Sequence, residues 1–323
     1  MLAILSITTP IFLLIGVGFV ARRWNLVSPV QLSGVANFVL YAALPALIVG
    51  ALTRNSLGEV ISLPLLLAYA LGSVATFVAC LWLPRNRRRK TATERAIQAL
   101  GMSASNSGFI AYPIAALALG QAAAGVILVH TMMVEVLLVI PGALVLAEIG
   151  QQADAKAGAA LRQTCQRLTR NPILISLTAG LAIAASGFRL PDTLTRTIEL
   201  LAGAAGPAAL FVIGGTLYGL KIRGMLKDMG QIMAGKLLLH PLLVLGLLLA
   251  LETVTGPLPP HLFAGAMIFA ACPMISIYPL IAQRFGMEGV GAAALMASTV
   301  ASFLTLSAVL WALSRVGLLP LLG

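Results

Sequence analysis

The chain has 323 residues, of which 59% are hydrophobic and 10% charged, and its mean hydropathy is +1.00. This composition excludes a soluble enzyme or soluble binding module and indicates a helical membrane protein with several spans. The formal net charge is +11, but the basic residues follow the pattern of membrane loops described below, so no nucleic-acid partner is expected.

Ten apolar segments occur along the chain. A helix needs about 20 apolar residues to cross a hydrocarbon core of roughly 30 Å, and each segment approaches or exceeds this length. The sequence therefore predicts an all-α membrane protein with ten transmembrane helices, numbered here as segments 1 to 10: 2–21, 30–52, 60–83, 95–119, 122–147, 171–187, 196–219, 230–251, 260–283 and 288–314.

The basic residues lie mainly in alternate loops. Cytosolic loops hold an excess of Lys and Arg in membrane proteins, so the richer side is expected to be cytosolic and both termini periplasmic. Lys236 falls inside segment 8, and only Arg54, Arg189, Arg196 and Arg315 fall on the outer side. The inner side holds Arg22, Arg23, Arg85, Arg87, Arg88, Arg89, Lys90, Arg95, Lys156, Arg162, Arg167, Arg170, Lys221, Arg223, Lys227 and Arg284.

The two halves of the chain repeat the same landmarks. Tyr112-Pro113 and Tyr278-Pro279 lie 166 residues apart, and Pro10 and Pro45 recur 162 residues later as Pro172 and Pro207. Five spans in each half give the second half the opposite orientation. We therefore expect two inverted five-helix repeats, residues 1–149 and 170–323, joined by a cytosolic linker over 150–169.

Segments 4 and 9 contain residues that disfavour a continuous helix. Serine, asparagine and glycine compete with the helix for hydrogen bonds, and proline removes a donor. We expect both helices to be broken and to cross at mid-membrane, where half-helix N-termini suit an anion. The alternative is that small residues only permit close helix packing. The expected substrate-binding residues are Ser103, Ser105, Asn106, Ser107, Gly108, Tyr112 and Pro113 of segment 4, with Pro273, Met274 and Ser276 of segment 9.

Three ionisable residues inside the spans are candidates for coupling, because charges in the membrane are costly. Glu135 in segment 5 could carry a proton or bind a cation, or it could be a structural carboxyl bonded to a neighbouring helix. Lys236 and His240 share a face of segment 8. Lys236 could attract an anionic substrate or snorkel to the cytosolic interface, and His240 could instead contact a neighbouring helix.

Several motifs together resemble the auxin efflux carrier family, which includes bacterial malonate-type permeases. They are Asn106-Ser107-Gly108-Phe109 with Tyr112-Pro113, Arg170-Asn171-Pro172, Gly206-Pro207-Ala208-Ala209-Leu210-Phe211, and Lys236 with Pro241. The resemblance implies a fold similar to the bile-acid sodium symporters. Segments 1, 2, 6 and 7 would form a scaffold, and segments 3, 4, 5, 8, 9 and 10 a transport core. Ala270-Ala271-Cys272-Pro273-Met274 offers no acidic side chain, which argues against sodium coupling there.

The leading hypothesis is a secondary transporter of small organic anions in the bacterial inner membrane. The resemblance implies malonate, related carboxylates or auxin-like acids as substrates, and elevator-type alternating access. The expected partners are the anion, membrane lipid, a proton as the coupling ion and a second copy of the chain bound through the scaffold helices. The alternative to proton coupling is uncoupled uniport, because the positive half-helix ends alone can hold an anion. The alternatives are a sodium-coupled organic anion symporter and a membrane sensor that does not transport its ligand. No nucleophile–base pair or metal-ligand motif occurs in the spans, so neither an enzyme, a metal site nor a cofactor is expected.

Overall fold

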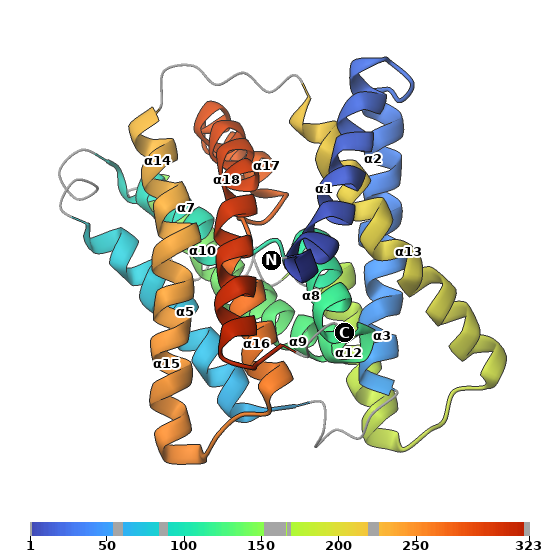
Figure 1. The fold of residues 1–323 in the computed structure, drawn as a ribbon. Helices are drawn as coiled ribbons and strands as arrows, with labels where there is room; N and C mark the ends of the chain where they lie inside the picture. Colours follow the sequence, from blue (N-terminus) through green and yellow to red (C-terminus); the bar gives the residue numbers. More distant parts are fainter. Residues whose placement is uncertain are drawn as a thin grey trace.

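The computed structural model describes residues 2–53, 61–83, 90–151, 166, 169–218 and 226–319, and all its regular elements there are helical (Figure 1). The first half contains α1 (Leu2–Arg23), α2 (Pro29–Phe38), η1 (Val39–Ala43), α3 (Leu44–Thr53), α5 (Leu63–Trp82), α7 (Ala92–Ser103), η2 (Ser107–Ala111), α8 (Tyr112–Leu119), α9 (Gln121–Val134), η3 (Glu135–Val139) and α10 (Ile140–Gln151). The second half contains α12 (Pro172–Ser186), α13 (Asp192–Leu217), α14 (Leu226–Ala234), η4 (Gly235–Leu239), α15 (His240–Thr255), α16 (Pro260–Ala271), α17 (Tyr278–Arg284) and α18 (Glu288–Arg315). The η elements are π-helical turns.

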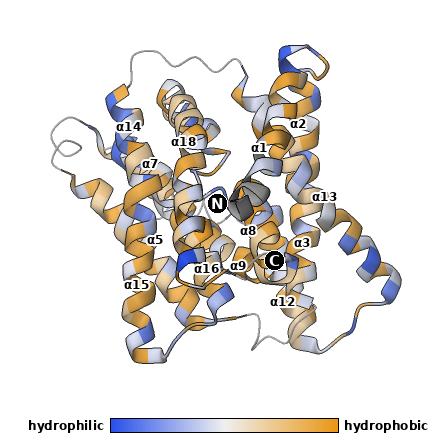
Figure 2. Ribbon diagram, viewed as in Figure 1, coloured by the Kyte–Doolittle hydropathy of each residue, from blue (hydrophilic) through white to orange (hydrophobic). Residues whose placement is uncertain are grey.

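Several of these helices are long and apolar, as in a multi-pass membrane protein. Within the described part of the chain, six helices are long and apolar enough to cross a membrane, by length and composition: 29–53, 63–82, 121–151, 192–217, 226–255 and 289–315. Shorter apolar helices cover 107–119, 172–186 and 260–271. Hydrophobic residues cover most of the ribbon, and hydrophilic residues gather near helix ends such as the starts of α13 and α14 (Figure 2).

Each π-helical turn is followed by a proline. The turns η1, η2, η3 and η4 end two residues before Pro45, Pro113, Pro141 and Pro241, respectively. A proline inside a helix lacks the N–H donor, and its ring clashes with the carbonyl four residues earlier. A π-helical turn widens the helix at that point, so the chain passes the proline without ending the helix. Glu135 and Lys236 both lie in such turns.

Two helices are interrupted, in segments 4 and 9. α7 ends at Ser103 and the helix resumes at Ser107, while α16 ends at Ala271 and α17 begins at Tyr278. The two breaks run antiparallel and form a β-bridge between Ser105 and Met274. The backbone N–H of Asn106 donates to the Pro273 carbonyl at 2.8 Å, and the N–H of Ile275 donates to the Ala104 carbonyl at 3.3 Å. Each break therefore satisfies backbone groups that the other leaves unpaired.

The helices form two groups in Figure 1. α1, α2, α3, α12 and α13 lie together on the right, and α5, α7, α14, α15 and α18 lie on the left. α13 packs against α1, α2 and α3, and α15 packs against α5. Glycines allow α1 and α13 to approach at backbone distance: a Cβ on Gly214 would lie 1.8 Å from the Ile15 carbonyl oxygen. Small residues at such contacts are typical of helix packing in membranes.

Most of the expected linker over 150–169 lies outside the described residues. Its first two positions belong to α10, which runs to Gln151.

Candidate functional site

A cavity of about 300 Å³ lies where the two breaks meet. Ser105, Asn106, Ser107 and Gly108 line it from the first break and Ser276 from the second. Glu135 lines it from η3, and Arg170 and Asn171 line it from the start of α12. A largely apolar wall is supplied by residues of η1 and of the start of α3: Leu40, Tyr41 and Leu44. The cavity thus combines a few polar groups with apolar walls, as small-molecule sites do.

Asn106 is an almost fully buried amide in the cavity wall. Only 2% of it is exposed. Its side-chain Oδ1 accepts a hydrogen bond from Ser276 Oγ at 2.9 Å, which joins the two breaks. Its Nδ2 is buried and has no hydrogen-bond partner among the described residues. An unpaired buried donor costs about 1–3 kcal/mol, so this amide is a group that a bound acceptor would satisfy.

The N-terminus of the half-helix over 107–119 points its free amides toward the same place. The N–H of Ile110 is the first to bond within this helix, to the Asn106 carbonyl at 3.0 Å. The amides of Ser107, Gly108 and Phe109 therefore precede the first intrahelical bond. Such amides and the positive end of the helix dipole favour an anion.

Glu135, which lies on a neighbouring helix, hydrogen-bonds to residues of the first break. Its Oε1 accepts hydrogen bonds from the backbone N–H of Ser105 at 3.0 Å and from Ser107 Oγ at 2.7 Å. Ser105 Oγ in turn contacts the Tyr69 hydroxyl of α5 at 2.9 Å. Glu135 is 1% exposed yet lines the cavity. Its carboxyl group therefore orders the backbone around Asn106 from a position beside the cavity.

Lys236 and His240 contact the end of α16, directly before the second break. Lys236 Nζ donates to the Ala270 carbonyl at 2.7 Å and lies 2.9 Å from His240 Nδ1. His240 Nε2 lies 3.0 Å from Ser73 Oγ on α5. Ala270 lies in the last turn of α16, where carbonyl groups lack intrahelical donors and a cation is favourable.

Neither Lys236 nor His240 lines the cavity between the breaks. Lys236 is fully buried, so the expectation that it snorkels to the interface is wrong. The Lys236 amino group donates to the Ala270 carbonyl in the protein interior. This carbonyl takes the place of the water that the amino group would contact at the membrane interface. His240 makes the contact with a neighbouring helix that was one of its two expected roles, through Ser73.

The other expected site residues stay outside this cavity. Ser103 Oγ donates to the Ala99 carbonyl of its own helix at 2.7 Å. Pro273 contributes its carbonyl to Asn106, and Met274 is fully buried at the bridge. Tyr112 lines a separate cavity of about 380 Å³ with Gln121 and Glu199. Pro113 is the second residue of α8 and follows the break rather than forming it.

Sequence reasoning missed Arg170 and Asn171 as cavity residues. The sequence predicts that Arg170 lies in a cytosolic loop and that segment 6 begins at residue 171. Asn171 does cap α12, since its Oδ1 accepts from the Ile173 N–H at 2.9 Å, and Pro172 follows at the first helical position. The capping signal was present in the sequence, but it could not reveal that this helix start faces the breaks.

Comparison with known proteins shows the family of the chain. A family model described as "Membrane transport protein" matches residues 4–312. A curated protein of Rhizobium meliloti (strain 1021), named "Putative malonate transporter", is 30% identical over 323 residues, which cover 99% of this chain and 98% of that protein.

Proposed function

The chain belongs to the membrane transport protein family, the auxin efflux carrier family that its motifs resemble, and from this we propose that it is a secondary transporter of small organic anions. The single observation that carries the proposal is Asn106, which lines the cavity between the breaks and whose buried Nδ2 has no hydrogen-bond partner among the described residues. The free amides at the N-terminus of the half-helix over 107–119 add further donors. Malonate and related carboxylates are the substrates to test first, because the relative from Rhizobium meliloti is named for malonate.

We propose that transport follows elevator-type alternating access. Two inverted five-helix repeats, 1–149 and 170–323, would supply ten transmembrane helices. The scaffold would be α1, α2, α3, α12 and α13, which form one group in Figure 1, and the remaining helices would form the moving core. The cavity lies where residues of η1, α3 and the start of α12 meet residues of the breaks, so movement between these groups would carry the anion.

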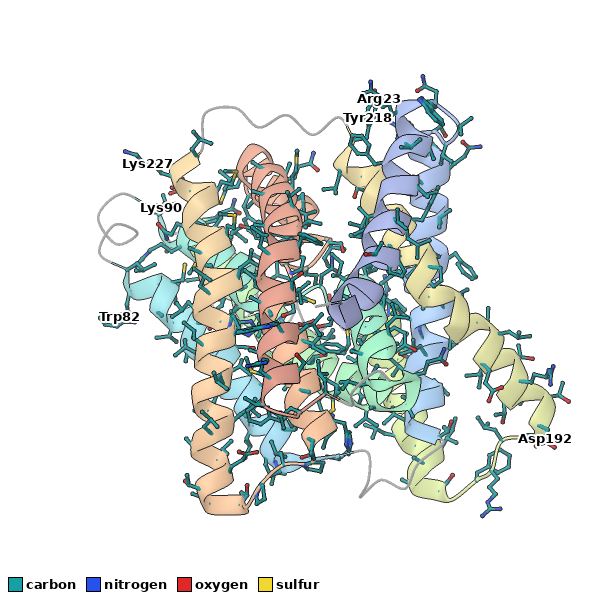
Figure 3. All side chains as sticks on the ribbon, in the orientation of Figure 1. Arg23, Trp82, Lys90, Asp192, Tyr218 and Lys227 are labelled. Atoms are coloured by element: carbon teal, nitrogen blue, oxygen red, sulfur yellow. The ribbon has the colours of Figure 1, made fainter. Side chains whose placement is uncertain are left out.

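The proposed orientation places the basic end of the molecule in the cytosol. Arg23, Lys90 and Lys227 lie at one end, and Asp192 lies at the other (Figure 3). The positive-inside rule supports this orientation, which puts both termini in the periplasm of a bacterial inner membrane. The scaffold helices would also face lipid and a second copy of the chain in a homodimer.

Proton coupling through Glu135 is favoured over sodium coupling. Glu135 lines the cavity, and its carboxyl group would carry the proton. At the second break the Ala270 carbonyl already accepts a hydrogen bond from Lys236, so a buried ammonium supplies positive charge there. A sensor that binds the same anion without moving it is the second candidate function, and the counterflow measurement described in the Discussion separates the two.

Asn106→Ala is expected to weaken anion binding by about 1–3 kcal/mol, because the anion loses a buried donor. Asn106→Asp is expected to weaken it at least as much, since an aspartate can keep the bond from Ser276 but replaces the donor with a negative charge. The backbone bonds of residue 106 to Pro273, Ile110 and Ala111 persist in both variants, so both are expected to fold.

The measurement is the shift in apparent melting temperature of the purified protein as malonate is added. Asn37→Ala, which removes an exposed amide from α2, is the matched control and should bind malonate as the wild type does. Normal affinity in both Asn106 variants would place the site elsewhere.

A further inference from the structure

We propose that Arg170 is the residue that makes this carrier select doubly charged anions: one carboxylate lies at Asn106, and the second binds the Arg170 guanidinium. This inference rests on the proposed function, because it concerns the substrate of the same cavity. Of the described residues that line the cavity, Arg170 and Glu135 carry the charged side chains, so Arg170 is the cationic group among them. With Glu135 ionised the two charges cancel, and protonation of Glu135 leaves the cavity with one positive charge.

The Arg170 guanidinium is available for a ligand. The Arg170 side chain is exposed, and it takes part neither in the Lys90–Asp228 ion pair nor in the Arg284–Glu148 ion pair. Glu135, the acidic residue of the cavity, is bonded to Ser105 and Ser107. A guanidinium presents a planar set of donors that matches a carboxylate with two parallel hydrogen bonds.

The start of α12 strengthens the same end of the cavity. Asn171 caps this helix, and the N–H of Ile175 is the first to bond back within it, to the Asn171 carbonyl at 3.0 Å. The positive end of the α12 dipole therefore adjoins the Arg170 side of the cavity. The second, independent sign of a ligand is Asn106, which lines the cavity and whose buried Nδ2 has no partner among the described residues.

The two anion-binding ends belong to different helices. Asn106 lies in the break after α7, and Arg170 precedes α12. A monocarboxylate can satisfy one end and leaves the other without a ligand. A short dicarboxylate can satisfy both. The volume of about 300 Å³ is at the small end of the roughly 300–1,000 Å³ range of ligand pockets, which favours a short molecule.

The test compares malonate with monomethyl malonate, which carries a single carboxylate on the same skeleton. Affinities are taken from ligand-dependent melting temperatures of the purified full chain. The wild type is expected to bind malonate at least about tenfold more tightly, because one charge-assisted hydrogen-bonded group is worth about 1.5–3 kcal/mol. Arg170→Gln should lose most of this preference by weakening malonate binding alone. Arg170→Lys should retain part of it, since lysine keeps the charge without the planar donor set.

Arg23→Gln is the control, because it removes one exposed positive charge at the end of α1 and away from the cavity. It should leave both affinities unchanged. An equal loss of both ligands in Arg170→Gln, or an unchanged preference for malonate, would overturn the role of Arg170. A wild type that binds the half-ester as tightly as malonate would overturn it too, but would leave anion transport standing. A wild type that binds neither ligand nor any other carboxylate would overturn the proposed function as well.

Discussion

Lys236→Ala is expected to lower the stability of the protein by about 3 kcal/mol or more. Truncation of a fully buried long side chain costs about 2–5 kcal/mol through the cavity it leaves. It also removes the 2.7 Å hydrogen bond to Ala270 and the contact with His240. The Ala270 carbonyl is in the last turn of α16 and is fully buried, so it loses its closest donor where water cannot replace it. The measurement is the apparent melting temperature in detergent.

Lys236→Met separates the two contributions, because methionine fills much of the same space without the ammonium group. It is expected to be less destabilising than Lys236→Ala. Lys227→Met, an exposed position on the same long helix, is the matched control and should change stability by less than about 0.5 kcal/mol. A Lys236→Ala variant that melts with the wild type would show that this ammonium does not hold the second break.

Glu135→Gln is expected to abolish proton-driven accumulation and to spare exchange. The glutamine carbonyl oxygen can accept the same bonds from Ser105 and Ser107, so the break keeps its shape while the residue can no longer bind and release a proton. A carrier that moves one proton with each anion should gain about tenfold in accumulation per pH unit, since tenfold corresponds to about 1.4 kcal/mol. Labelled malonate uptake into proteoliposomes with and without a pH gradient measures this ratio.

The matched control for Glu135→Gln is Asp192→Asn, which removes an exposed acidic charge at the start of α13. It should accumulate malonate as the wild type does. Gradient-driven accumulation that persists in Glu135→Gln would show that Glu135 is a structural residue and that coupling, if present, uses another group.

The positions of the helices and of their interruptions follow from local chemistry. The serines, glycine and asparagine after Met102 predicted the first break, and residues 104–106 leave the helix there. The prolines predicted irregularity, but its form differs from place to place. Pro45, Pro113, Pro141 and Pro241 follow π-helical turns in continuous helices, whereas Pro10 and Pro207 lie inside α1 and α13. A proline in the sequence therefore indicates a weakened helix, but it does not decide whether a π-helical turn forms before it.

The chemistry of the site depends on contacts that no local pattern contains. The spacing of Lys236 and His240 predicted a shared face, and the two side chains do meet. Their third partner, Ala270, is 34 residues from Lys236, so its carbonyl could not be foreseen. The position of Arg170 could not be foreseen either. The motif around it indicates the start of a helix, but only the packing of that helix brings Arg170 to the cavity that Asn106 also lines. Residues that meet through the crossing of helices require the fold to be known.

The measurement that tests the account most directly is malonate counterflow in proteoliposomes without any ion gradient. Vesicles loaded with unlabelled malonate are diluted into a trace of labelled malonate, and a carrier transiently concentrates the label inside. The wild type is expected to show this overshoot, and Asn106→Ala should show a weaker one at the same protein content, because the cavity between the breaks is the proposed path of the anion. Malonate binding without counterflow in the wild type would contradict transport and favour the sensor.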